Sequence, residues 1–364
     1  MSGGALIDLV AKGAQDVYLT GSPEVSFFRQ NFKRHTNFAM KPSKLNVLGT
    51  VGAGNEISIK IPNKGDLLDY IWIDLSDEIG SKLGVETANP AIFELWIGGQ
   101  MVDRQDATFM ALHWQKFLVD SGAKAVAAFN AGSASTRAKL LKSTFLPLHF
   151  SFCDDMPLPL VALQYHEVEI RVKFPSSFTS TTATFYANFI VVDTTERQFF
   201  TSNDHEILIE QVQRLPVTSG TGGNVTFDLS LLNHPVKSLH WTVPSDPDYN
   251  TGTAMIWLNG TSLFDDDMPD KYFTSVQGYY HSEHASELLK VGGSGTECGD
   301  GLKMYSFARK PCKHFPTGAC NFSRLDNAEM KISGADTSTG AYLNAVNWNI
   351  LRIKSGMAGV AFSN

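Results

Sequence analysis

The sequence is short of charge, of basic excess and of long apolar runs, and each shortage argues against a class of protein. Charged residues make up 18% of the 364 residues, below the roughly 25% of an average soluble domain. A surface with so little charge favours burial against other chains. The net charge of -7 lacks the basic excess that proteins tracking nucleic-acid phosphates need, so we expect no nucleic-acid partner.

Membrane spans and disulfide frameworks are equally absent from the pattern. No stretch approaches the ~20 consecutive apolar residues of a membrane span, and residues 1–19 lack the basic start and long apolar core of a signal peptide. We therefore expect the chain to stay soluble in the compartment where it is made. The cysteines form no CxxC pair, and a chain of this length needs no disulfide staple. We expect reduced thiols at Cys153, Cys298, Cys312 and Cys320.

The residues that are abundant favour strands and turns. The chain holds 24 Phe, 30 Gly and 15 Pro, and its 43% hydrophobic residues suffice for the cores of two domains. An apolar strand ends at Val192, a polar segment follows, and alternating strand residues resume at His205. We interpret this as the end of one β domain, a linker and the start of another. The predicted division is an N-terminal arm at 1–24, a first domain at 25–195, a linker at 196–205 and a second domain at 206–364.

The two predicted domains repeat the same landmarks in the same order. Four pairs of segments match: 55–62 with 225–231, 71–75 with 239–243, 95–99 with 256–260, and 168–172 with 328–332. Ile57 lies 14 residues before Ile71, and Val225 lies 14 residues before Leu239. Each half also closes on an apolar strand that carries Asn. Four matches in one order indicate a duplicated domain, and the domain-sized period excludes a solenoid.

Two segments carry helical rather than strand periodicity. Apolar residues on one face predict a short amphipathic helix over Gly4–Gly13, which either packs on its own domain or docks on a neighbouring subunit or layer. Residues 107–119 place large apolar side chains at roughly helical spacing, within a long insertion of the first domain. The Ala-, Gly- and Ser-rich segment 122–135 of that insertion is expected to be a mobile loop.

Candidate metal ligands occur without the spacing that metal sites use. No His-x-His pair exists, which argues against a cupin-type metal enzyme. His281, His284 and Glu287 lie three residues apart, but in a polar stretch that lacks an apolar frame to orient ligands. The set Cys298, Cys312, His314 and Cys320 lacks the knuckle spacing of structural zinc. We expect no metal and no cofactor.

Catalytic and calcium motifs are missing as well. The acidic segment 265–270 lacks the Gly and terminal Glu of an EF-hand loop, which favours a solvated turn. Asp154 and Asp155 point oppositely if extended and make a poor acid and base pair. No nucleophile elbow, phosphate loop or dinucleotide fingerprint is present, so we predict that the protein is not an enzyme. Without a signal peptide, the Asn-x-Ser/Thr sites at Asn224, Asn259 and Asn321 are not expected to carry glycans.

Longer strings resemble the major capsid proteins of the nucleocytoplasmic large DNA viruses. They follow the family's order over almost the whole chain: Gly13–Pro23, Arg34–Ala39, Ile97–Asp103, Leu158–Val168, Asp193–Arg197, Leu232–Lys237, Tyr305–Ala308, Asn321–Asp326 and Asn349–Gly359. The resemblance implies an all-β double jelly roll, in which two eight-stranded antiparallel sandwiches stand in tandem, with short helices in loops and at the N-terminus.

The same resemblance implies a role in the virion. Three copies are expected to form a pseudo-hexagonal capsomer that tiles an icosahedral capsid shell, assembled in the host cell cytoplasm. Minor capsid and penton proteins are the further partners that it implies. It also places Ser2–Pro23 on the inner side, near an internal membrane, and 122–135 and 265–301 on the exterior. The chain is short for the family, with trimmed loops in its second domain, so a small outer surface is expected.

Two other functions compete with the structural one. Aromatic residues in expected turns and loops, namely Trp257 beside Asn259 and the pair Tyr279 and Tyr280, are typical of glycan-binding jelly rolls. The same rings can instead fill the sandwich. A bicupin-like metal enzyme is the third hypothesis, which the missing His-x-His pair already weakens.

Overall fold

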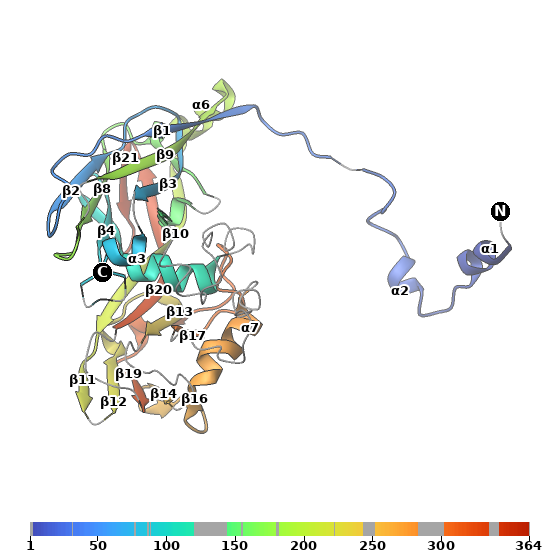
Figure 1. Ribbon diagram of the computed structural model, residues 1–364. Coiled ribbons are helices and arrows are strands. Elements are labelled where there is room, and N and C mark those ends of the chain that lie inside the picture. The colour runs from blue at the N-terminus through green and yellow to red at the C-terminus, as the bar shows by residue number, and fades with distance from the viewer. Residues whose placement is uncertain are drawn as a thin grey trace. The chain divides into compact units, whose positions relative to one another are not determined.

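The computed structural model describes residues 3–30, 32–75, 78–85, 87, 89–119, 144–153, 156–179, 182–221, 223–242, 252–282, 302–334 and 342–363 (Figure 1). The chain divides into two units, Met1–Asn37 and Phe38–Asn364. The first unit contains the short helices α1 (Gly3–Val10) and α2 (Val17–Thr20), and neither helix has a buried residue. The helix expected over Gly4–Gly13 is therefore present as α1.

Two antiparallel sheets are built from the first half of the second unit alone. One sheet has the order β1-β9-β3-β6, with β7 also pairing with β3, and the other has the order β2-β8-β4-β5. Their bounds are β1 Phe38–Lys44, β2 Glu56–Lys60, β3 Leu67–Leu75, β4 Ile92–Ile97, β5 Gln100–Asp106, β6 Phe145–Pro147, β7 Leu158–Pro159, β8 Val168–Lys173 and β9 Ala183–Val192. We call these two sheets barrel 1.

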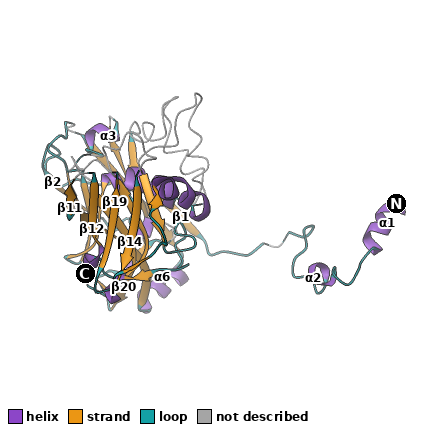
Figure 2. Ribbon diagram, turned by 90° about the horizontal axis from the view of Figure 1, so that it is seen from below, coloured by secondary structure: helices purple, strands orange, loops and turns teal. Residues whose placement is uncertain are grey.

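Two further antiparallel sheets are built only from the second half, and we call them barrel 2. One has the order β10-β20-β13-β17, with β18 on β13 and β21 on β20, and the other has the order β11-β12-β19-β14-β15, with β16 on β14. Their bounds are β10 His205–Pro216, β11 Ser219–Thr221, β12 Asn224–Asp228, β13 Pro235–Thr242, β14 Thr253–Leu258, β15 Thr261–Ser262, β16 Met268–Pro269, β17 Leu302–Ser306, β18 Cys320–Asn321, β19 Ala328–Ser333, β20 Tyr342–Lys354 and β21 Met357–Val360. The strands of both barrels are prominent in Figure 2.

The two barrels share one topology, which is that of a double jelly roll. In barrel 1 the first strand pairs with the last and the last with the third, and β10-β20-β13 repeats this order in barrel 2. The second sheets correspond in the same way, as β2-β8-β4-β5 and β12-β19-β14-β15. All four landmark pairs of the sequence fall on equivalent strands. The predicted all-β tandem fold is confirmed, while the exact domain boundaries stay a prediction.

One turn shows how closely the duplication extends to the backbone. The hairpin β4-β5 turns at Gly98 and Gly99, and the equivalent hairpin β14-β15 turns at Asn259 and Gly260. All four residues have positive φ, between 48° and 80°. Two successive positive φ angles define the type I′ turn, whose twist matches that of a two-residue hairpin and which favours Gly and Asn.

Alternating apolar residues build the core of each barrel. The side chains of Ile57 and Ile59 on β2 are buried, whereas the flanking Glu56 and Lys60 are exposed, as the period of a strand with one dry face requires. Trp241 and Phe227 are at the centre of the core of barrel 2. The apolar cluster of barrel 1 is larger, because it continues across onto residues of β10, β17, β20 and β21. The two barrels therefore share an apolar cluster across their interface.

Short helices occupy the connections. They are α3 (Ile79–Lys82), η1 (Phe109–Leu118), η2 (Ser151–Cys153), η3 (Leu160–Ala162), α6 (Thr194–Ser202), η4 (Leu229–Leu231), η5 (Tyr272–Val276), α7 (Gln277–His281) and η6 (Phe322–Arg324). The helical spacing noted over 107–119 corresponds to η1, a π-helix. The segment 122–135, for which a loop was expected, lies outside the described residues.

The connection between the barrels differs from a simple polar linker, because it is mostly helical. Helix α6 spans Thr194–Ser202, and the Asp193 carboxylate accepts a hydrogen bond from the Thr194 amide at its start. Arg197 donates through Nε to Asp66 Oδ1 over 2.7 Å, and the Asp66 carboxylate is buried in barrel 1. This pairing ties the connection to the barrel that precedes it. No helix among the described residues is long and apolar enough to cross a membrane.

Candidate assembly surfaces

The first surface is already occupied, because helix η1 of barrel 1 lies against barrel 2. All ten residues of η1 are buried, and the teal helix in Figure 1 lies between the two barrels. His113 Nε2 is 2.8 Å from Thr242 Oγ1 on β13, and Lys116 donates to the Leu302 carbonyl over 3.2 Å. Buried polar groups are costly without partners, and these partners come from the other barrel. The helix thus joins the barrels by both apolar and polar contacts.

Strand β10 of barrel 2 continues the same interface, which we call the seam. The Val212 amide donates to Asp103 Oδ1 on β5 over 2.9 Å. The Gln211 side-chain amide donates to the Val102 carbonyl. Two residues earlier on the same edge of β10, the Glu210 amide donates to Ser151 Oγ over 3.1 Å. These bonds cross between barrels, so they fix the position of β10 along β5 and η2.

Two acidic side chains at the seam have raised pKa values. Burial raises the pKa of Asp103 to about 7, although hydrogen bonds from Val212, Gln105 and Arg104 oppose the shift. Burial also raises the pKa of Asp106, which Arg214 opposes from 3.5 Å. Desolvation disfavours the charged form of an acid, which is the cause of both shifts.

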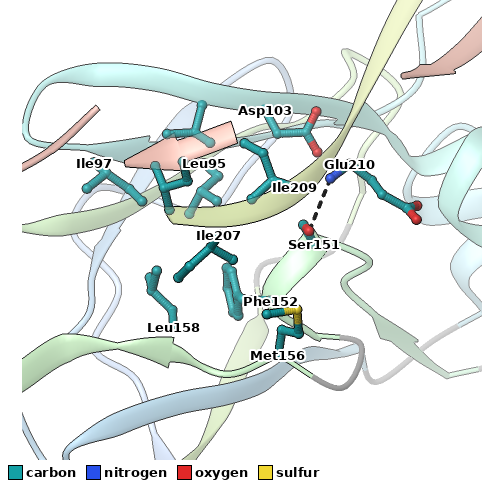
Figure 3. Close-up of a pocket in the computed structure, with 12 residues that line it drawn as sticks. Leu95, Ile97, Asp103, Ser151, Phe152, Met156, Leu158, Ile207, Ile209 and Glu210 are labelled. Atoms are coloured by element: carbon teal, nitrogen blue, oxygen red, sulfur yellow. Dashed lines mark hydrogen bonds between the residues drawn. The ribbon is translucent and has the colours of Figure 1, made fainter. Parts of the chain in front are cut away.

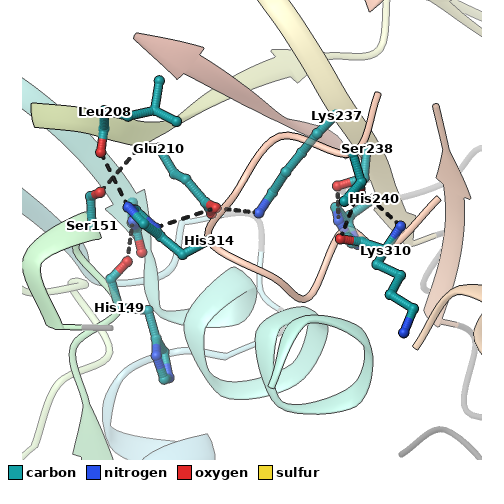
Figure 4. A network of polar contacts seen from close by, with 11 residues as sticks. His149, Ser151, Leu208, Glu210, Lys237, Ser238, His240, Lys310 and His314 are labelled. Atoms are coloured by element: carbon teal, nitrogen blue, oxygen red, sulfur yellow. Dashed lines mark hydrogen bonds and ion pairs between the residues drawn. The ribbon is translucent and has the colours of Figure 1, made fainter. Parts of the chain in front are cut away.

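A polar network lies deeper along the seam (Figure 4). Lys237 Nζ is 2.5 Å from Glu210 Oε1, and both side chains are buried. His314 Nδ1 is 3.8 Å from the same Glu210 oxygen, and its Nε2 is 3.2 Å from the Leu208 carbonyl. Lys237 also lies 5.0 Å from the ring centre of Trp348. The geometry is that of a structural ion pair, since each group faces another protein group.

The cavities along the seam differ in what they can hold. An apolar cavity between β4, η2 and β10 has a volume of about 20 Å³ (Figure 3), which is space for a single water molecule. A groove lined by Arg104, Asp106, Arg214 and Tyr342 has a volume of 480 Å³. A second groove of 360 Å³ lies over Glu210 and His314. The guanidinium of Arg214 lies 4.6 Å from the ring centre of Tyr342, so ion pairing and stacking already engage the cation in the larger groove.

Other surfaces present apolar side chains to solvent. In the unit 1–37, the exposed apolar residues are Leu6, Ile7, Leu9, Val10, Val17, Tyr18, Leu19, Val25, Phe27, Phe28 and Phe32. In barrel 1, Trp72 on β3 stacks on Tyr186 of β9 at 4.5 Å, with Phe145 edge-on to it. All three rings are partly exposed. Large apolar patches of this kind mark interaction sites.

The candidate metal ligands of the sequence do not come together among the described residues. No group of three or more His, Cys, Asp or Glu side chains there has the geometry to hold a metal ion. His281 Nδ1 lies 3.1 Å from the Arg309 carbonyl, and His314 belongs to the polar network. Cys320 is on β18, and neither it nor Cys153 or Cys312 forms a disulfide among the described residues. Cys298, His284 and Glu287 lie outside the described residues. The absence of a metal stays a prediction.

The acidic segment 265–270 is only partly the expected solvated turn. Asp265, Asp266 and Asp267 are exposed. Asp270 is instead fully buried and lies 2.6 Å from Lys303 Nζ, which is also buried. No pattern in the sequence predicted this pair, because Lys303 lies on β17, 33 residues further along the chain. Asp154 and Asp155 lie outside the described residues.

The remaining candidates lie on the surface of barrel 2. Asn224, Asn259 and Asn321 are exposed, and Asn259 Oδ1 accepts from the amides of Asp326 and Asn327. Trp257 is half-buried under Lys331, whose Nζ lies 5.7 Å from the ring centre. Tyr279 and Tyr280 on α7 are 66% and 73% exposed and meet edge to face. The paired tyrosines therefore do not fill the sandwich.

The fold and the surfaces are those of a structural protein with a double jelly roll. Comparison with known proteins leads to the same class. A family model for the major capsid protein N-terminus matches residues 26–205, and one for the large eukaryotic DNA virus major capsid protein matches residues 196–359. The chain belongs to the major capsid proteins of large eukaryotic DNA viruses. Its role is structural, as part of the virion shell. The resemblance noted in the sequence is confirmed.

Individual relatives cover the whole chain. The major capsid protein of Pyramimonas orientalis virus is 35% identical, with 100% of both chains covered. That of Paramecium bursaria Chlorella virus 1 is 31% identical, covering 99% of this chain and 100% of the relative. The solved structure of VP54 from the same Chlorella virus has 26% identity and a TM-score of 0.70, covering 93% of this chain and 100% of VP54. The Faustovirus major capsid protein shares the fold at 11% identity, with a TM-score of 0.63 and 96% of each chain covered.

Proposed function

We propose that three copies of this chain form a pseudo-hexagonal capsomer that tiles an icosahedral shell. The observation that carries the proposal is the repeated topology, since β1-β9-β3-β6 and β10-β20-β13-β17 make two equivalent blocks in one chain. Three chains with two equivalent blocks each give six similar blocks around one axis. A heterologous contact that closes on itself generates such a ring. The function of the protein is then to form specific contacts with neighbouring subunits, and this function requires no catalysed reaction.

Other partners follow from the surfaces. The exposed apolar residues of the unit 1–37 favour burial against minor capsid proteins, penton proteins or an internal membrane. The low charge and net charge of -7 favour protein partners over nucleic acid. We also propose that the shell assembles in the host cytoplasm and that the protein needs no cofactor or metal.

Electron microscopy of the purified protein tests the trimer directly. We expect class averages with three-fold symmetry and a hexagonal outline. Class averages that show only single two-lobed particles, even at high protein concentration, contradict the proposal.

The alternative is a glycan-binding role on the virion surface, which the exposed pair Tyr279 and Tyr280 favours. Aromatic rings at a surface are common in sugar sites, because their faces pack on the apolar side of a sugar ring. A glycan array with the purified protein tests this function. Binding that is lost in Tyr280→Ser supports it, and an array without binding disposes of it.

A further inference from the structure

Equivalent sheet faces differ in burial between the two barrels. On β13 and β20, the outward pair His240 and Asn344 is completely buried. In barrel 1 the equivalent outward pair is Trp72 on β3 and Tyr186 on β9, which are partly exposed. The equivalence follows from the register, since the preceding inward pairs are Leu239 with Ala345 and Ile71 with Ala187. One face has a cover within the chain, and its counterpart shows a ring cluster to solvent.

The cover of the buried face is helix η1. The ring centres of Phe109 and Phe117 lie 5.7 and 5.9 Å from that of His240. His113 reaches Thr242 at the end of β13. Barrel 1 therefore contributes a helix that follows its strand β5, and barrel 2 contributes the outer face of its β10-β20-β13-β17 sheet.

Barrel 2 has its own copy of this cover. The helix pair η5 and α7 follows β16, which pairs with β14 as β5 pairs with β4 in barrel 1. Phe273 anchors it in the core of barrel 2, as Phe109 anchors η1 in the core of barrel 1. Unlike η1, it has exposed large residues, namely Val276, Tyr279 and Tyr280. The described part of the chain leaves these three side chains uncovered, so the helix pair presents an exposed apolar face.

We infer that η5 and α7 of one copy cover the outer face of β1-β9-β3-β6 in the next copy. This inference rests on the proposed trimer, because a ring repeats between chains the relation that barrel 1 has to barrel 2 within a chain. The ring cluster of Trp72, Tyr186 and Phe145 then meets Tyr279 and Tyr280. The Met40 side chain lies on the same face, on the edge strand β1, and is 58% exposed. It extends the apolar surface. The occupant is a second copy of this chain.

Charge agrees with this assignment. The sheet face carries Asp69 and Asp74, both partly exposed on β3, and the helix pair begins after the exposed Lys271. At the seam, the residue equivalent to Asp74 is Thr242, which pairs with His113 of η1. Independently of that pair, the exposed Lys271 gives the covering helix a positive charge at its start, and the covered sheet face is acidic, so the two surfaces have complementary charge.

Site-specific photo-crosslinking tests the contact. Benzoylphenylalanine replaces Tyr186. Isotope-labelled and unlabelled chains are mixed before assembly, so that the mass of a crosslinked peptide pair shows whether it joins two chains. We expect the crosslinked tryptic peptide to be Tyr272–Lys290, which contains α7. As a control, the same probe replaces Tyr165, which is 74% exposed but lies elsewhere, beside Gly356. This probe should not capture that peptide.

A second variant keeps the test decisive if the probe disturbs folding. Tyr280→Asp with Tyr279→Ser should lower the trimer fraction at least tenfold and leave the unfolding midpoint of the monomer unchanged. Trimers whose Tyr186 crosslinks reach other peptides overturn this contact and leave the proposed capsomer standing. If neither wild type nor variants form trimers, the proposed function itself fails.

Discussion

The β10-β20-β13-β17 sheet of barrel 2 and the β1-β9-β3-β6 sheet of barrel 1 have the same strand order and opposite surroundings. The first presents His240, Asn344 and Val346 to η1 and the seam, where they are fully buried. The second presents Trp72 and Tyr186, which remain partly exposed. Equivalent positions thus carry smaller polar side chains on the face that η1 covers, and large rings on the face that remains partly exposed. This difference supports the proposed contact, in which another copy of the chain covers the second face.

The interior of the barrels differs as well, and this comparison carries the largest expected effect. Lys303 on β17 pairs in register with Trp241, and Leu146 on β6 holds the equivalent position opposite Ile73. Lys303→Ala leaves the buried Asp270 without its cation, which should cost about 3–5 kcal/mol of unfolding free energy. Urea unfolding measures the loss.

The control for this experiment is Lys60→Ala, which breaks the exposed pair with Glu167. That variant should lose far less stability, because solvent screens the exposed pair. The double variant Lys303→Leu with Asp270→Leu removes both buried charges and should recover most of the stability. Equal losses in Lys303→Ala and Lys60→Ala would show that the buried pair is not needed.

The buried face of barrel 2 should be sensitive to acid. Burial, with His113 and Lys237 nearby, holds the pKa of His240 well below its usual value of 6.5. The unfolded chain binds a proton as pH falls through 6.5, and the folded chain does not, so stability is present above 6.5 and lost below it. The loss should approach about 1.4 kcal/mol per pH unit. In urea unfolding at pH 7.5, 6.5 and 5.5, His240→Gln should show a shallower slope, and the exposed His35→Gln should keep the wild-type slope.

Asp103 at the seam should act with the opposite sign. Its pKa is raised to about 7 in the folded chain by burial and lies near 3.8 when unfolded. Between these values the folded chain keeps a proton that the unfolded chain has lost, so its contribution falls as pH rises. Asp103→Asn keeps an oxygen acceptor for the Val212 amide and removes this slope of up to about 1.4 kcal/mol per pH unit. Its stability relative to wild type should therefore rise from pH 5 to pH 7. A constant difference, like that expected for the exposed Asp326→Asn, would contradict the assignment.

The exposed face of barrel 1 should matter least to the isolated chain. Trp72→Ser removes a partly exposed ring, so we expect a loss of about 1 kcal/mol or less in the monomer, with a large fall in the trimer fraction. Phe117→Ala, at the covered counterpart, should instead destabilise the monomer by about 3 kcal/mol or more. Unfolding and sedimentation of the same two variants compare them. Equal monomer losses would erase the distinction between the two faces.

Much of the fold could be predicted from period-two patterns, because each repeated landmark contains inward residues that any sandwich must bury. Ile57 with Ile59 and Val225 with Phe227 are examples. The seam could not be predicted in this way, since Lys116 and His240 are polar and each contacts residues of the other barrel. Helix α6 was missed because its sequence is polar, with no buried residue to mark a face. The buried role of Asp270 depends on a single distant lysine, which no local pattern announces.

Sedimentation equilibrium of the full-length protein tests the central claim most directly. The account predicts a species of three times the 39.9 kDa of one chain, formed by wild type and weakened by Trp72→Ser. A species that remains at the mass of one chain at the highest concentration would contradict it.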